Sequence, residues 1–163
     1  MKKLIIILAL AMPMLVNAQK YGYVNTQELF AQMPEVNVVK AQMDTIQGQY
    51  ETQLALMNEE LQRKYKDYQT NSSTMADAIR QMREQELGEM QQRIETFYQT
   101  AQQDIQKKQQ ELLAPINEKL AKAIQEVGAA EGYTYIFDSA AMVYISDDAI
   151  SAMDSVKKKL GIK

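Results

Sequence analysis

Two pairs of adjacent carboxylates, Glu59–Glu60 and Asp147–Asp148, are the side chains of this chain best suited to general acid–base chemistry. Such chemistry needs a desolvated pocket that shifts the pKa of a carboxyl group. The first pair falls in a long, thin predicted helix and the second at a predicted helix start, so neither has a cleft around it. The chain also contains no His and no Cys, which removes the commonest acid–base group and every thiolate. We therefore predict no catalytic residue and no enzyme activity.

Cofactor and nucleic-acid binding are disfavoured on similar grounds. The chain has no glycine-rich phosphate loop of the form GxxxxGK[ST], which nucleotide use would favour. Without His and Cys, the best metal ligands are missing. The formal net charge is −3, with 18 basic and 21 acidic residues, and an acidic chain is a poor partner for phosphate backbones. We expect no cofactor, no metal, no nucleotide and no nucleic acid.

The first eighteen residues have the pattern of an export signal. Lys2 and Lys3 precede an apolar run over 4–16, which is too short for a comfortable membrane span. Small residues at 16–18 suit cleavage after Ala18, and an uncleaved anchor is the alternative. We expect residues 1–18 to be a signal peptide and residues 19–163 to be exported. Without Lys2 and Lys3, the mature chain has 16 basic residues against 21 acidic ones, a formal net charge of −5.

Apolar residues recur at steps of three and four in two long stretches, with a polar segment at 71–74 between them. This spacing places the apolar side chains on one side of an α-helix. The two stretches therefore predict one long antiparallel helical hairpin with its tip near 71–74. The first stripe is Met43, Ile46, Tyr50, Leu54, Met57, Leu61, Tyr65 and Tyr68, and the second is Met90, Ile94, Phe97, Ala101, Ile105, Lys108, Leu112 and Ile116.

A mirror alignment of the two stripes predicts the register of the hairpin. When the stripes are aligned about Ser72, apolar residues face apolar residues, as Tyr50 faces Ile94. In the same alignment, Lys40 faces Asp104. Such an exposed ion pair stabilises little, typically under ~1 kcal/mol, but helps to fix the register.

Short elements at the two ends of the chain predict a small β-containing body. Three segments rich in strand formers, 21–24, 133–137 and 142–145, are the predicted strands. The fold class is therefore mostly α with a small β body. A thin hairpin buries little core, so we expect the chain to oligomerise. The other predicted elements are a short helix capped by Asn25, long helices over 35–70 and 74–127 with Thr74 as a cap, a kink or break at Pro115, and a last helix begun by a cap at Ser146 or Asp147 and ended by Gly161.

Several segments of the chain resemble the Skp/OmpH-like family of periplasmic chaperones. Residues 20–30 resemble the opening of the family, and residues 115–120 and 132–138 resemble its junction and second strand. The resemblance implies a homotrimer in which short strands form a central trimerisation body and three arms enclose a cavity. It implies an ATP-independent holdase that carries unfolded outer-membrane proteins across the periplasm of a Gram-negative bacterium. In domain terms, residues 19–34 and 116–163 would be the body and residues 35–115 the arm.

This sequence departs from the family in its charge. The best-known members are strongly basic, which helps them hold anionic clients and touch lipopolysaccharide, whereas this chain is acidic. We therefore carry no lipopolysaccharide site over to it. The alternative function is a structural or docking protein of the cell envelope, with the hairpin as a spacer. The methionine-containing seam favours the chaperone, since a spacer would favour a rigid Leu/Ile heptad.

Two sets of residues near the arm tip are candidate functional residues. Aromatic and Met side chains suit promiscuous contact with clients, although they would serve equally well to fill the helix–helix seam, as we expect for Met43, Ile46, Leu54 and Leu61. The basic set suits contact with an anionic membrane surface, or is an ordinary solvated helix face; the register brings Arg63 and Lys64 towards Arg80, which leaves their charges unneutralised across the hairpin. The client-contact candidates are Tyr65, Tyr68, Met75 and Met82, and the anionic-surface candidates are Arg63, Lys64, Lys66, Arg80 and Arg83.

Overall fold

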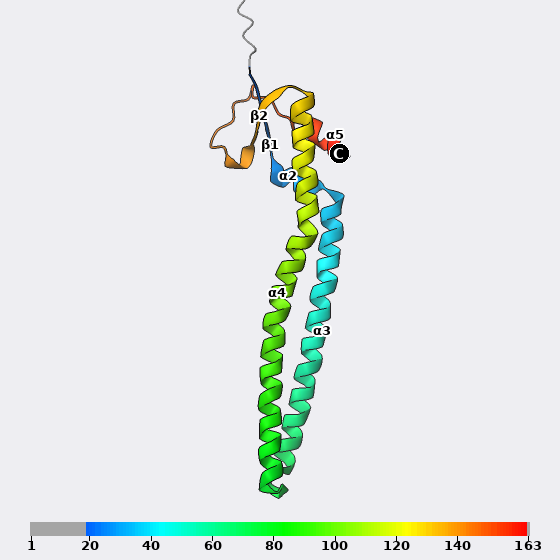
Figure 1. Cartoon of the computed structure of the whole chain (residues 1–163), viewed down its shortest axis with the longest axis vertical. Coiled ribbons are helices and arrows are strands. Elements are labelled where there is room, and N and C mark those ends of the chain that lie inside the picture. Colours follow the sequence, from blue (N-terminus) through cyan, green and yellow to red (C-terminus); the bar gives the residue numbers. More distant parts are fainter. Residues whose placement is uncertain (1–18, 163) are drawn as a thin grey trace, which may run out of the picture.

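The computed structural model describes residues 19–162, and the predicted signal peptide lies outside them. A long two-helix arm extends from a small body that contains both ends of the described chain (Figure 1). No helix within 19–162 is both long enough and apolar enough to cross a membrane. The elements are β1 (Lys20–Val24), α2 (Thr26–Gln32), α3 (Pro34–Asn71), the 3-10 turn η1 (Ser72–Thr74), α4 (Asp77–Ala130), β2 (Tyr133–Asp138), the 3-10 turn η2 (Ser139–Ala141) and α5 (Met153–Leu160).

The arm consists of α3 and the part of α4 that runs antiparallel to it (Figure 1). At about 1.5 Å per residue, the 38 residues of α3 span roughly 57 Å. Pro34 begins α3, where its missing N–H is not needed. The predicted stripes do form the seam, because Met43, Met90 and Ala101 are buried and most other stripe residues are half-buried. The helical hairpin expected from the sequence is therefore confirmed.

The tip differs from the prediction in how α4 begins. The connection is η1 followed by extended Met75 and Ala76, and α4 starts at Asp77 with no side-chain cap. The predicted cap at Thr74 is wrong, because the Thr74 hydroxyl donates a hydrogen bond to the carbonyl oxygen of Asn71 instead, at 2.9 Å. The midpoint of the hairpin thus lies beyond Ser72.

This later midpoint shifts the register of the arm. The Tyr50 hydroxyl donates a hydrogen bond to Asp104 at 2.6 Å, and the rings of Tyr50 and Phe97 lie 5.8 Å apart. The predicted pairs Tyr50–Ile94 and Lys40–Asp104 are therefore wrong. Residues of α3 face residues roughly one to two helical turns further along α4 than the mirror alignment placed them.

The sequence predicted a kink or a break at Pro115, and of these two alternatives the break is wrong, because Pro115 lies inside the continuous helix α4. The helix runs through it, and Figure 1 shows only a change in the direction of the axis between the body and the arm. Proline removes one backbone hydrogen bond of the helix. Half-buried Leu112 and Leu113 and buried Ile116 pack on either side of it, and this packing holds the helix together.

The body contains a two-stranded parallel sheet, with Tyr21 opposite Tyr135 and Tyr23 opposite Phe137. On the other side of β1, Ser151 forms an isolated parallel bridge with Tyr23. The predicted third strand over 142–145 is wrong, because this segment pairs with no strand within residues 19–162 and belongs to a loop. Strand formers need another backbone to pair with, and the chain around Ser151 already occupies the free side of β1.

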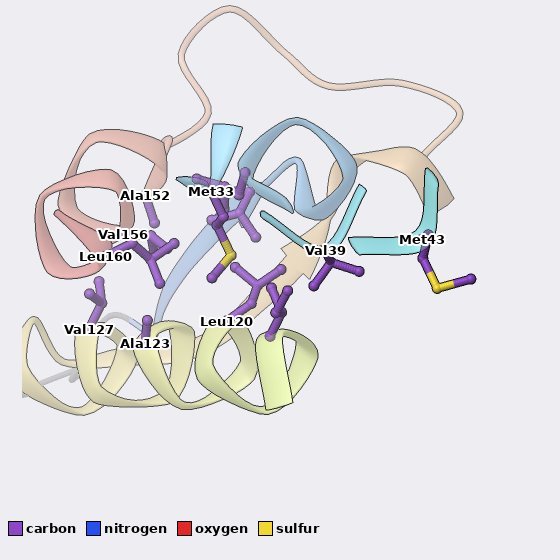
Figure 2. Packing of buried hydrophobic residues seen from close by; sticks show 12 residues of the cluster. Met33, Val39, Met43, Leu120, Ala123, Val127, Ala152, Val156 and Leu160 are labelled. Carbon is purple, nitrogen blue, oxygen red and sulfur yellow. The ribbon is translucent and has the colours of Figure 1, made fainter. Parts of the chain in front are cut away.

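The core lies where the body meets the base of the arm. Figure 2 shows Ala123 and Val127 of α4 pointing towards Val156 and Leu160 of α5, and Leu120 of α4 pointing towards Met33. Outside the core, Lys157 pairs with Glu28 and Lys159 pairs with Glu126, which fastens α5 to α2 and α4. Gly161 then ends α5 with a φ of 73°, a left-handed conformation that suits glycine. The buried cluster comprises Val24, Leu29, Met33, Val39, Met43, Ile116, Leu120, Ala123, Val127, Ala152, Val156 and Leu160.

Candidate functional site

The large apolar side chains that remain exposed fall into two groups. One group, which we call the body face, lies on the sheet and the loop that follows η2. The other, which we call the arm set, is spread along α3 and α4. The body face is Tyr21, Tyr135, Phe137, Val143, Tyr144 and Ile150, and the arm set is Val38, Leu56, Tyr65, Ile79, Met82 and Tyr98.

The body face is built on aromatic side chains from neighbouring strands. Alternate residues of a strand point to the same side of a sheet, so Tyr135 and Phe137 lie together. Tyr21 stacks on Tyr135 with 5.9 Å between the ring centroids and 3° between the planes. An aromatic surface of this kind is typical of a contact with another protein surface.

The loop after η2 forms the rest of the body face. Val143 and Tyr144 are 106% and 81% exposed, so they make almost no contact within the chain. Between this loop and β1 lies a groove of about 420 Å³, lined by Tyr21, Phe137 and Tyr144 among others. The body thus offers both an exposed apolar segment and an apolar groove.

The client-contact candidates at the arm tip divide into two kinds. Tyr65 and Met82 are 49% and 53% exposed, and they are available for contact. Met75 and Tyr68 are half-buried. The Tyr68 hydroxyl donates a hydrogen bond across the hairpin to Glu84, which raises the pKa of Tyr68. Tyr68 therefore ties the two helices together.

Most of the basic candidates at the tip have carboxylate partners. Lys64 pairs across the hairpin with Glu86, and Arg83 pairs with the same carboxylate at 2.8 Å. These two bonds, that of Lys64 first, lower the pKa of Glu86. Arg80 pairs with Asp77. The expectation that Lys64 stays unneutralised across the hairpin is wrong, because the shifted register brings Glu86 to it.

Arg63 and Lys66 make no ion pair with any residue of the described part of the chain. Both side chains are exposed. They are the two cations of the predicted set that remain available for an anionic surface.

The paired carboxylates singled out for acid–base chemistry lie in open positions. Glu59 and Glu60 are exposed on α3, and Asp147 and Asp148 are exposed in the loop before α5. Within residues 19–162, no three side chains of the metal-ligating types come together.

A family of known proteins matches most of this chain. The model of the family described as outer membrane protein (OmpH-like) matches residues 20–160. The chain belongs to the OmpH-like family. The resemblance found in the sequence is confirmed.

The relatives of this OmpH-like chain include several chaperones. It is 28% identical to the chaperone protein Skp of Yersinia enterocolitica over 151 residues, 93% of this chain and 92% of that one. It is 26% identical to the chaperone protein Skp of Pectobacterium atrosepticum, over 86% of each chain. The predicted absence of enzyme activity is consistent with membership of a chaperone family.

A solved structure shares the fold. An OmpH-like outer membrane chaperone from Caulobacter crescentus CB15 superposes with a TM-score of 0.78, over 87% of this chain and 83% of that one, at 19% sequence identity. The predicted fold class, mostly α with a small β part, is confirmed.

Three features of the arm of this OmpH-like chain were not predicted from the sequence. Leu87 is buried in the seam although it is not in the predicted stripe. Leu56 and Tyr98 are 56% and 48% exposed on the arm. Each lies beside a stripe residue, Met57 or Phe97, and an apolar residue off the stripe is a signal of an exposed position.

Acidification should destabilise the body of this OmpH-like protein. The pKa of Glu35 lies below its ordinary value of 4.5, mainly because Lys119 donates a hydrogen bond to it. Lys159 likewise donates a hydrogen bond that lowers the pKa of Glu126. The hydroxyl of Thr26 donates one that lowers the pKa of Asp138 from its ordinary value of 3.8. A carboxyl group with a lowered folded pKa stabilises the fold above its unfolded pKa and loses that contribution as the pH falls through the folded value.

We therefore expect the thermal unfolding midpoint, followed by circular dichroism, to fall as the pH drops from about 5 to about 3. At the upper end of this pH range, the variant Glu35→Gln should have a lower unfolding midpoint than the parent protein. Its midpoint should also depend less on pH. A midpoint that stays constant over the same range would show that these carboxyl groups do not support the fold.

Proposed function

We propose that this protein is an ATP-independent holdase chaperone that binds unfolded outer-membrane proteins and prevents their aggregation in the periplasm of a Gram-negative bacterium. The observation that carries the proposal is the arm set, whose six exposed apolar side chains are distributed over both helices of the arm. Distributed contacts suit an unfolded partner, which has no fixed shape to fill a pocket. The Skp relatives, which are named chaperones, support the same function.

The strength of such contacts explains why one arm is not enough. Burying a half-exposed apolar side chain contributes on the order of 1 kcal/mol. Micromolar affinity needs about 8 kcal/mol before the cost of ordering the client is counted. The arm set of one chain has six members, so several arms must act together on one client.

We place the assembly of these arms in the body, as a homotrimer. The loop with Val143 and Tyr144 makes almost no contact in its own chain, and the body face offers an apolar groove. In the proposed trimer, this loop of one subunit covers the body face of the next. Residues 19–34 and 116–163 then act as the oligomerisation domain and residues 35–115 as the arm, after removal of residues 1–18.

The tip has a subsidiary role in this proposal. In this proposal, Arg63 and Lys66 contact an anionic membrane surface, because the other basic candidates have carboxylate partners. Tyr65 and Met82 belong to the arm set and contact the client. The proposed function uses no nucleotide.

The proposal is tested by aggregation of a β-barrel outer-membrane protein diluted from urea. Light scattering should stay low when residues 19–163 are present at a slight molar excess of trimer, and it should rise without them. An equal mass of serum albumin is the control for general crowding. If the scattering curve with this protein matches the albumin curve, the chain is not a holdase.

A further inference from the structure

The middle of the arm carries an excess of negative charge. We define the mid-arm band as residues 41–62 of α3 and residues 88–109 of α4, which face one another in the observed register. The α3 part contains four carboxylates and no base, and the α4 part contains three carboxylates and three bases. The acidic residues are Asp44, Glu51, Glu59, Glu60, Glu89, Glu95 and Asp104, and the bases are Arg93, Lys107 and Lys108.

Within the described residues, most of these carboxylates have no cationic partner; Asp104 shares a groove with Lys108, but Lys107 and Lys108 form their ion pairs with Glu111. Six of the seven carboxylates are exposed, and none of the seven makes an ion pair with a residue in 19–162. The ends of the arm differ, because Glu35 pairs with Lys119 near the body and Glu86 pairs with Lys64 near the tip. The negative potential is therefore concentrated half-way along the arm.

The same band contains apolar contact surface. Leu56 and Tyr98, two members of the arm set, are exposed here. A shallow groove of about 680 Å³ runs along the band, with Met57 and Phe97 among its lining residues. Arg93 also lines the groove but has Glu89 in the same lining, so the groove does not reverse the sign of the band.

We propose that the mid-arm band binds cationic amphipathic segments of unfolded chains, those in which Lys or Arg alternates with large apolar residues. The inference rests on the proposed holdase function and specifies which part of a client this arm prefers. Apolar side chains of the segment cover Leu56, Tyr98 and the groove, and its basic side chains lie against the surrounding carboxylates. An acidic segment of equal hydrophobicity meets like charge and is disfavoured.

The preference should depend on salt. Each exposed contact between opposite charges contributes roughly 0.2–1 kcal/mol, so several together change the affinity by about tenfold or more. Such interactions are screened over about 10 Å at 0.1 M salt and over about 3 Å at 1 M. Apolar contacts remain at high salt, so binding itself should persist while the discrimination disappears.

The test uses two fluorescein-labelled peptides with the same apolar residues, one with Lys and the other with Glu at every polar position. Fluorescence anisotropy measures their binding to residues 19–163. At about 20 mM NaCl the Lys peptide should bind about tenfold more tightly, and at about 500 mM NaCl the difference should fall below about threefold. Equal affinities at low salt, or tighter binding of the Glu peptide, would overturn the inference.

A pair of matched variants separates the band from net charge. Glu51→Gln, Glu59→Gln and Glu60→Gln together should reduce the preference for the Lys peptide at least threefold, roughly half of the expected discrimination on a logarithmic scale. Glu118→Gln, Asp147→Asn and Asp154→Asn remove the same charge from exposed positions outside the band. They should leave the preference nearly unchanged. An equal loss in both variants would show that bulk charge alone is responsible, and the inference would be wrong.

The aggregation assay distinguishes a failure of the holdase function from a failure of the charge preference. If the protein suppresses aggregation but treats both peptides alike, the holdase function stands and the charge preference is wrong. If it suppresses no aggregation and binds neither peptide, both are wrong. Circular dichroism of each variant confirms that the helices are intact.

Discussion

Val143→Asp should convert the assembled protein into monomers and abolish its suppression of aggregation. Val143 is fully exposed within one chain, so the substitution removes no contact from the subunit fold. In the proposed trimer, the new carboxylate is buried against the aromatic body face of a neighbouring subunit. Burying an unpaired carboxylate costs several kcal/mol, and a trimer with three such sites cannot form at micromolar concentration.

Light scattering coupled to gel filtration measures this effect directly, since the mass should fall to that of one chain. Val38→Asp is the matched control, because it places the same residue at another exposed valine, in α3 outside the body face. It should leave the mass unchanged. If Val143→Asp keeps the mass of the parent protein, the loop at 142–145 does not form the interface.

Leu29→Ala should destabilise the body by about 2–5 kcal/mol, the usual range for a leucine removed from a packed core. Leu29 of α2 is completely buried and is among the largest fully buried side chains of the described chain. The body is small, so its total stability is modest, and much of it would be lost. A body that unfolds would also release the arms from one another.

Urea unfolding followed by circular dichroism should show the midpoint of Leu29→Ala shifted well below that of the parent. Leu56→Ala removes the same atoms from an exposed site on α3, and its midpoint should change little. Similar shifts for the two variants would show that α2 is not part of the cooperative core.

The hairpin could be predicted from the sequence but its register could not. Apolar steps of three and four are enough to assign a helix and its buried side. However, sliding one stripe by three, four or seven residues again places apolar residues opposite apolar residues. The choice among these registers depends on the tip. There the Thr74 hydroxyl donates a hydrogen bond to the carbonyl oxygen of Asn71, and α4 begins only at Asp77.

The parts that failed depend on partners that a linear pattern does not contain. The segment 142–145 has strand formers, but a strand requires a second backbone, and the chain around Ser151 already pairs with Tyr23. The pairing of Lys64 follows from the register, because only the shifted alignment brings Glu86 across from it. The Asn25 cap, which accepts a hydrogen bond from the backbone N–H of Glu28 at 3.0 Å, was predicted correctly. The predicted cap of the last helix at Ser146 or Asp147 is wrong, because α5 begins only at Met153 and has no side-chain cap.

The parallel pairing of β1 with β2 determines the order in which this chain can fold. Residues 25–132 separate the two strands, so the sheet closes a very long loop. The hairpin contains mostly local contacts, which form fast, whereas distant strand pairing is slow. Because the N-terminal part of a chain is synthesised first, the arm can form before the C-terminal residues that complete the sheet and α5 are present. The body, and with it any oligomer, therefore forms only from chains that contain the C-terminal residues. A truncated chain lacks β2 and α5 and cannot assemble.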